Sequence, residues 1–288
     1  MQPGKILVVI IALGLVTGLV AGCGESAETT AVRRDTDEET TADSTEAAET
    51  TTPRPVASGP PLQVALAIDG TAHPGRVATE YVEDAAILIS EVIERGGGYR
   101  LSIFRGAGPQ MALGTITLAP SDPIEKRYEQ ASKVYYETIA LPIDEALGQM
   151  PATPEVKKRL AALPEGSAVG EAVREAVEAV REQKGERWVV IATDGIDETQ
   201  GDLPLPNVKQ TARILRRVVS NVNARGVGIA MVGVGLDRGH TRWNEDGPLT
   251  KAWARVCREI HARECQIHAD PRLPPPLQGT ATAILEGV

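Results

Sequence analysis

The chain has 288 residues, with 30 lysines and arginines against 39 aspartates and glutamates, so its formal net charge is −9 at pH 7. Only 3% of its residues are aromatic. An acidic total, without a basic run and with few rings to stack on bases, argues against a nucleic-acid-binding protein. We therefore expect no nucleic acid among its partners.

Residues 1–22 have the pattern of an export signal. A single cation, Lys5, precedes an apolar run over residues 6–20, and small residues follow the run. The run is about 15 residues long, shorter than the roughly 18 residues of a membrane-spanning helix, so we expect it to be removed after export. Cleavage after residue 22 would make Cys23 the new N-terminus.

The stretch Leu19–Cys23, with the sequence LVAGC, resembles the lipobox of bacterial lipoproteins. In that family the Cys is diacylated and the preceding peptide is cut off, so the resemblance implies that lipid such as palmitate is attached to Cys23. Two or more acyl chains hold a protein stably on a membrane. We expect a protein anchored by lipid to the cell membrane on its extracytoplasmic face. An uncleaved apolar anchor and an ordinary secretory signal are the alternatives, and both also place the chain outside the cytoplasm.

Residues 23–60 differ sharply in composition from the rest of the chain. Thr, Glu, Ala, Asp and Ser dominate, and nine acidic residues stand against three arginines, a net charge of −6. Such a stretch cannot bury enough apolar surface to offset the entropy of ordering it. We predict a disordered acidic tether, which as a flexible coil would reach roughly 35 Å on average.

Residues 61–270 are predicted to form one domain, followed by a Pro-rich tail at 271–288 that could add an edge strand. Strand-length apolar runs alternate here with segments of helical period. The predicted elements, in chain order, are a strand at 64–68, a helix at 74–95, a hairpin of 99–105 and 113–118, an insertion and helix at 122–150 broken near Pro142, a helix at 169–183, a strand at 188–193, a helix at 207–224, a strand at 227–234, a helix at 249–262 and a strand at 265–269. The role of the insertion at 122–165 is left open.

The alternation of strands and helices predicts an α/β fold. Parallel strands joined by right-handed helical crossovers give a doubly wound, mostly parallel sheet with helices on both faces, and the hairpin adds one antiparallel edge. In such sheets ligands bind beyond the carboxyl ends of the strands. Functional residues are therefore expected at those strand ends.

Two carboxylates stand at these positions. Asp69 directly follows the first buried strand, and Asp194 directly follows the strand at 188–193. Ser167 lies between them in sequence, in the loop that opens the helix at 169–183. Carboxylates and hydroxyls with room for water suit a hard cation such as Mg²⁺.

This pattern resembles the von Willebrand factor type A domain, whose metal-ion-dependent adhesion site combines an Asp-x-Ser-x-Ser motif, a distant Thr and an Asp in a Thr-Asp-Gly motif. Asp69, Thr71 and His73 stand at the first motif, Ser167 at the distant Thr, and Asp194 in Thr-Asp-Gly. The similarity extends from about residue 62 to about residue 269. The resemblance implies a degenerate site that holds Mg²⁺ or another divalent cation through Asp69, Thr71, Ser167 and Asp194.

The departures from the family motif leave two interpretations open. Thr71 and Ser167 each keep a hydroxyl that can coordinate a cation. His73 replaces a small oxygen ligand by an imidazole, which suits transition metals better than Mg²⁺. In the alternative interpretation Asp69 and Asp194 hold no metal and only cap loops and helix N-termini.

The remaining motifs give a disulfide prediction and exclude a nucleotide site. The glycines at 233 and 235 are followed by one at 239, which is the wrong spacing for a dinucleotide-binding loop, so no nucleotide is expected. Cys257 and Cys265 are eight positions apart in a chain predicted to be exported, which favours a disulfide. A zinc site formed by these two cysteines with His261 and His268 is the alternative.

The sequence contains no nucleophile elbow, His-Glu zinc motif or phosphate-binding loop, so no enzyme is expected. We expect a binding module that recognises a protein or a component of the cell envelope through the end of its sheet. A metal-free structural or assembly subunit of the envelope is the first alternative. A metal-dependent hydrolase that uses Asp69, His73 and Asp194 is the second.

Overall fold

The computed structural model describes residues 59–71, 75–135, 139–201, 203–204, 207–235, 247–274 and 277, without the side chains of residues 75, 76, 140 and 141. These residues all belong to one unit, Val56–Val288. The expected signal, Cys23, the tether and His73 lie outside the described residues, as does the tail beyond 277. No helix within the described ranges is long and apolar enough to cross a membrane.

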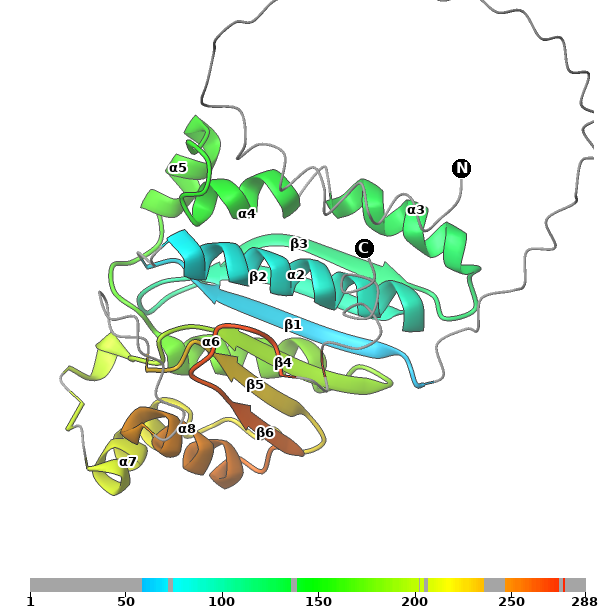
Figure 1. Ribbon diagram of the computed structural model, residues 1–288. Helices are drawn as coiled ribbons and strands as arrows, with labels where there is room; N and C mark the ends of the chain where they lie inside the picture. Colours follow the sequence, from blue (N-terminus) through cyan, green and yellow to red (C-terminus); the bar gives the residue numbers. More distant parts are fainter. Residues whose placement is uncertain are drawn as a thin grey trace, which may run out of the picture. The chain divides into compact units, whose positions relative to one another are not determined.

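A six-stranded sheet with the order β3-β2-β1-β4-β5-β6 organises the domain (Figure 1). All neighbouring strands are parallel except the antiparallel pair β2 and β3 at one edge. The strands are β1 (Leu62–Asp69), β2 (Gly97–Phe104), β3 (Met111–Leu118), β4 (Glu186–Ala192), β5 (Gly228–Val232) and β6 (Glu264–Ile267). The expected fold class and the expected edge hairpin are thus confirmed.

The central strands are apolar along their whole length because helices cover both faces of the sheet. Helix α2 (Gly75–Arg95) packs on β1 and β2 on one face. Three helices pack on the other face: α6 (Val169–Val180), α7 (Val208–Val218) and α8 (Pro248–Glu259). Between these helices and the sheet lies a core of small and branched side chains, with Ala67, Ile191 and Met231 from the strands and Val173 and Val256 from the helices.

The segment between β3 and α6 contains three helices, α3 (Ile124–Val134), α4 (Ala140–Ala146) and α5 (Pro154–Ala161). The expected break near Pro142 does not fall at the proline itself, because Pro142 is the third residue of α4, and helix α3 ends earlier, at Val134. A proline in the first turn removes no intrahelical hydrogen bond, since the first amides have no partner within the helix. Helix α5 was not expected. It begins at an N-cap, Thr153, whose side chain accepts a hydrogen bond from the amide of Val156.

Two elements near the C-terminal part of the sheet are shorter than expected. Helix α7 ends at Val218 rather than near residue 224, because Val219 leaves the helical conformation, with a φ of −107° and a ψ of 22°. Strand β5 ends at Val232, because Gly233 has a φ of 84° and its amide donates to the carbonyl of Asp270 instead of continuing the ladder.

The structure joins Cys257 of α8 to Cys265 of β6 in a disulfide, with the two Cα atoms 6.0 Å apart. This arrangement agrees with the disulfide prediction and uses both sulfur atoms that the alternative zinc site would need. Whether the bond forms in the cell stays a prediction.

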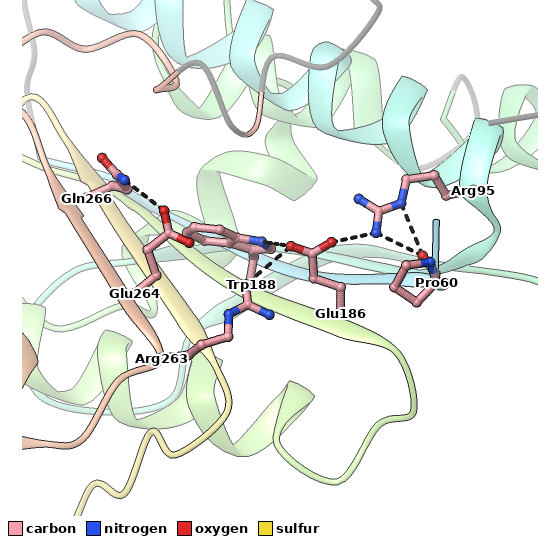
Figure 2. A network of polar contacts seen from close by, with 7 residues as sticks. All are labelled: Pro60, Arg95, Glu186, Trp188, Arg263, Glu264 and Gln266. Atoms are coloured by element: carbon pink, nitrogen blue, oxygen red, sulfur yellow. Dashed lines mark hydrogen bonds and ion pairs between the residues drawn. The ribbon is translucent and has the colours of Figure 1, made fainter. Parts of the chain in front are cut away.

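A network of polar side chains lies at the amino ends of β4 and β6 and reaches Pro60, directly before β1 (Figure 2). Glu186 of β4 accepts hydrogen bonds from the side chains of Arg95, Trp188 and Arg263, and Arg95 also donates to the carbonyl of Pro60. Burial raises the pKa of Glu186, but the hydrogen bonds from Arg95 and Trp188 outweigh burial, so the pKa is lowered. The guanidinium of Arg263 also lies 5.1 Å from the centre of the Trp188 ring.

Candidate functional site

Asp69 is the centre of a cluster of hydroxyl groups at the carboxyl end of β1. Its side chain is fully buried. The amide and hydroxyl of Thr71 both donate to Asp69 Oδ1, at 3.0 and 2.8 Å. Ser167 Oγ and Thr193 Oγ1 donate to Asp69 Oδ2, at 2.8 and 2.9 Å. Hydroxyls from three separate segments of the chain therefore meet on one carboxylate.

Ser167 is positioned by the backbone around it. The amide of Ala168 donates to the carbonyl of Arg105, and the carbonyl of Ser167 accepts from the amide of Glu198. Gly166 precedes Ser167 with a φ of 87°, a conformation that few other residues adopt. These two backbone hydrogen bonds fix the loop before α6, and the Ser167 side chain lies buried in the cluster.

The loop that carries Asp69 and Thr71 is also held from the neighbouring strand. The amide of Gly70 donates to the carbonyl of Phe104 at 2.7 Å, and Arg105 Nε donates to the carbonyl of Gly70 at 2.9 Å. An added Cβ at Gly70 would lie 2.6 Å from a methyl group of Ile103, so a larger residue would displace the loop. Arg105 therefore connects the Asp69 loop and the Ser167 loop, since its own carbonyl accepts from Ala168.

Asp194 lies at the carboxyl end of β4, the strand next to β1, and is almost fully buried. Its Oδ1 accepts a hydrogen bond from the amide of Ile196 at 2.9 Å, and its carbonyl accepts from the amide of Gly235 at 2.7 Å. Thr193 connects it to the cluster, because the Thr193 hydroxyl donates to Asp69 and accepts from the amide of Gly195. The second carboxylate thus stands at the same edge of the sheet, as parallel strand ends require.

Tyr81 carries a third titratable group, whose pKa the two carboxylates influence. Tyr81 is a fully buried residue of α2. Burial raises the pKa of its phenol well above the ordinary value, and the negative charges of Asp69 and Asp194 raise it further. The phenol therefore stays protonated and can act only as a neutral group beside the carboxylates.

The donor set of this cluster consists of oxygen atoms. Two carboxylates and three hydroxyls are ligands of the kind that Mg²⁺ prefers, and none of these groups favours a soft metal. Among the described residues there is no group of three or more His, Cys, Asp or Glu side chains that could hold a metal. A cation here would therefore depend on the hydroxyls as well as on Asp69 and Asp194.

The structure brings together Asp69, Thr71 and Ser167 directly and places Asp194 beside them. Sequence reasoning missed Thr193 and Tyr81. The sequence predicts Thr193 as the last residue of a strand, and its position directly before Asp194 is the signal for a site residue. Tyr81 fits an ordinary core position of a helix, and nothing in its spacing distinguishes it.

No protein-family model and no curated protein matches the sequence. Among solved structures, an aerotolerance-related membrane protein from Bacteroides fragilis is 18% identical and covers 78% of this chain and 97% of its own, with a TM-score of 0.37. The conserved hypothetical protein BatB from Bacteroides thetaiotaomicron is 15% identical and covers 78% of this chain and 98% of its own, with a TM-score of 0.35. The pilus adhesin SpaC from Lactobacillus rhamnosus is 11% identical, with a TM-score of 0.44, and 80% of this chain matches 31% of that one.

Proposed function

We propose that this chain is a lipid-anchored, extracytoplasmic binding module that recognises a protein or envelope component through the carboxyl end of its sheet, with a divalent cation in the contact. The observation that carries the proposal is the convergence of Thr71, Ser167 and Thr193 on Asp69. Hydroxyl groups gathered on a buried carboxylate at this edge are the arrangement that the von Willebrand factor type A resemblance implies. Binding rather than turnover is proposed, because the sequence carries no motif for a nucleophile.

The proposed ligands of the cation are Asp69, Thr71, Ser167, Thr193 and Asp194, with Mg²⁺ or another hard divalent ion. The cation would offset the repulsion between two buried carboxylates and leave a coordination position for an acidic group of the partner. His73 lies outside the described residues, so a ligand role for its ring stays a prediction from the sequence.

A thermal shift experiment tests the cation. Only the folded state assembles the ligands, so Mg²⁺ or Mn²⁺ should raise the Tm of the parent protein by mass action. Asp69→Ala and Asp194→Ala should each remove that rise, whereas Glu178→Gln, which removes an exposed charge on α6, should keep it. Calorimetry that detects no heat with any divalent ion, together with an unchanged Tm, would reject a cation site.

Substitutions at Ser167 distinguish a role as a cation ligand from a role in packing. Ser167→Ala removes the hydroxyl and should weaken the cation-dependent rise in Tm. Ser167→Thr keeps a hydroxyl at the same position and should retain most of the rise. Equal loss in both variants would point to disturbed packing of this buried residue rather than to a lost ligand.

A metal-free structural or assembly subunit of the envelope is the second proposal, and one observation favours it. Both oxygens of Asp69 already accept hydrogen bonds from hydroxyls, so the cluster satisfies that carboxylate without a cation. A pulldown from native envelope with and without a chelator distinguishes the two. Partners lost on chelation support the cation-dependent module, and partners retained support the metal-free subunit.

A further inference from the structure

The outer surfaces of α7 and α8 carry a concentration of cations that the proposed function does not use. Six exposed side chains form what we call the basic face: Lys209, Arg213, Arg217, Lys251, Arg255 and Arg258. In each helix they follow one another at intervals of three or four residues, so they lie on one side of the helix. The opposite sides are buried in the core through residues such as Leu215 and Val256.

Helices α7 and α8 pack side by side on the same face of the sheet, so their solvent-exposed sides are neighbours (Figure 1). Glu259 is the one acidic residue within the sequences of these two helices, and it pairs with Arg255 at 2.8 Å. Within the part of the chain that the structure describes, no carboxylate pairs with Arg213, Arg217 or Arg258. Lys251 has an interaction within the chain, so the positive charge of the basic face rests on Lys209, Arg213, Arg217 and Arg258, in a chain whose total charge is −9.

Helix stability does not explain this arrangement. Arg217 and Arg258 stand in last turns, where a cation interacts favourably with the helix dipole. Lys209 stands in the first turn of α7, where the dipole disfavours a cation. Lys209, Arg213 and Arg217 also follow one another at intervals of four residues, a spacing at which like charges repel. The isolated domain thus bears an electrostatic cost that an external anion would relieve.

The composition of the basic face indicates the kind of anion. Protein interfaces also use arginine, but they are centred on aromatic and other large apolar side chains. Among the described residues, Met150 is the one large apolar side chain that is strongly exposed, and it belongs to neither helix. A face of flexible cations without an apolar centre suits a diffuse anionic surface, of which a bilayer with acidic headgroups is one.

We propose that the basic face binds the headgroups of anionic phospholipids and lays the domain against the membrane. The proposal uses the expected anchoring of the N-terminus but is independent of the cation site, since the residues of the basic face are not among the proposed cation ligands. The anchor supplies proximity, because a tether that reaches roughly 35 Å keeps the domain at a high effective concentration near the lipid surface.

Lysine footprinting on the full chain tests the proposal. The protein is mixed with vesicles of phosphatidylcholine, with or without phosphatidylglycerol, and acetylated with a water-soluble reagent, and the rate at each lysine is read by mass spectrometry. On the anionic vesicles the acetylation rates of Lys209 and Lys251 should fall at least about threefold, because contact with acidic headgroups shields their amines. Lys157 and Lys158 of α5, both exposed, serve as internal references and should not change. High salt should remove the protection.

Two triple variants with reversed charges, one on the basic face and one elsewhere, test whether the protection depends on the basic face. The triple substitution Arg213→Glu, Arg217→Glu and Arg258→Glu keeps both reporter lysines and should abolish their protection. The same number of reversals at exposed cations elsewhere, Arg100→Glu, Lys133→Glu and Arg181→Glu, should leave the protection intact. Melting curves of both variants verify that each is folded.

Three outcomes would overturn the proposal. The first is equal reactivity of Lys209 and Lys251 on neutral and anionic vesicles. The second is protection that survives reversal of the basic face, whatever the control variant shows. The third is protection by soluble polyglutamate or by a nucleic-acid duplex without protection by phosphatidylglycerol, which would assign the face to an acidic protein or to a nucleic acid. None of these results depends on Mg²⁺ binding, so failure here and failure of the cation site are distinguishable.

Discussion

Asp84 of α2 is a buried carboxylate that contacts the chain beyond β6. Its Oδ1 accepts a hydrogen bond from the amide of Leu273 at 3.1 Å, and its Oδ2 has no hydrogen-bond partner. Burial raises the pKa of Asp84 well above its ordinary value. The Leu273 amide opposes that rise, and the charges of Glu80, Glu83 and Asp270 add to it. The segment after β6 is therefore held by a group that prefers to be protonated.

The sign of the pH dependence follows from this raised pKa. The folded state binds the Asp84 proton more tightly than the unfolded chain does, so the contribution to stability is complete below the ordinary carboxyl pKa and is lost as the pH rises through the raised value. Asp84→Asn removes the titration and should flatten this part of the pH profile of the free energy of unfolding. Denaturant unfolding from acidic to neutral pH measures it. An unaltered slope in Asp84→Asn would contradict the assignment.

Gly228 of β5 is required by the indole ring of Trp188. A Cβ added at Gly228 would lie 2.6 Å from a carbon of that ring. Since Trp188 is buried and also held by Glu186 and Arg263, Gly228→Ala should cost about 1–3 kcal/mol of unfolding free energy through overpacking. Gly98→Ala is the matched control, because the one close approach of its added Cβ would be to the end of the flexible Gln63 side chain, at 2.5 Å. Similar losses in both variants would mean that glycine is needed for the strand itself.

At the scale of elements, the link between α8 and β6 is the Cys257 to Cys265 disulfide. The bond closes a short loop, and closing such a loop contributes about 2–3 kcal/mol to the free energy of unfolding. Reduction, or the double substitution Cys257→Ser and Cys265→Ser, should lower stability by about that amount. Mass spectrometry of protein exported to an oxidising compartment checks the bond directly. Free thiols at both positions would end the disulfide assignment.

At the scale of the whole molecule, the proposed lipid anchor at Cys23 would decide where the domain works. If Cys23 carries lipid, Cys23→Ser should release the protein from the membrane fraction or leave it unprocessed, and labelled palmitate should no longer enter it. Fractionation and N-terminal sequencing measure these outcomes. Membrane retention in Cys23→Ser with an intact Met1 would support a plain apolar anchor instead.

The sequence by itself determined the fold class and the location of two candidate ligands. Hydrophobic period distinguishes buried strands from amphipathic helices, and alternation of the two leaves few topologies other than a mostly parallel sheet. Asp69 and Asp194 could be found because each directly follows a buried strand, and parallel strands end at one edge. Boundaries were less accurate, as at Val218 and Pro142, because hydrophobic period does not fix the residue at which a helix begins or ends.

Only the tertiary structure decided which groups meet. Thr193 joins Asp69 across 124 positions of the chain, and Asp84 holds Leu273 across 189. The basic face likewise depends on α7 and α8 lying side by side, although each stripe of cations is already present in its own helix. Local periodicity carries no information on such pairings, because they follow from the order of strands in the sheet and from the packing of helices on it.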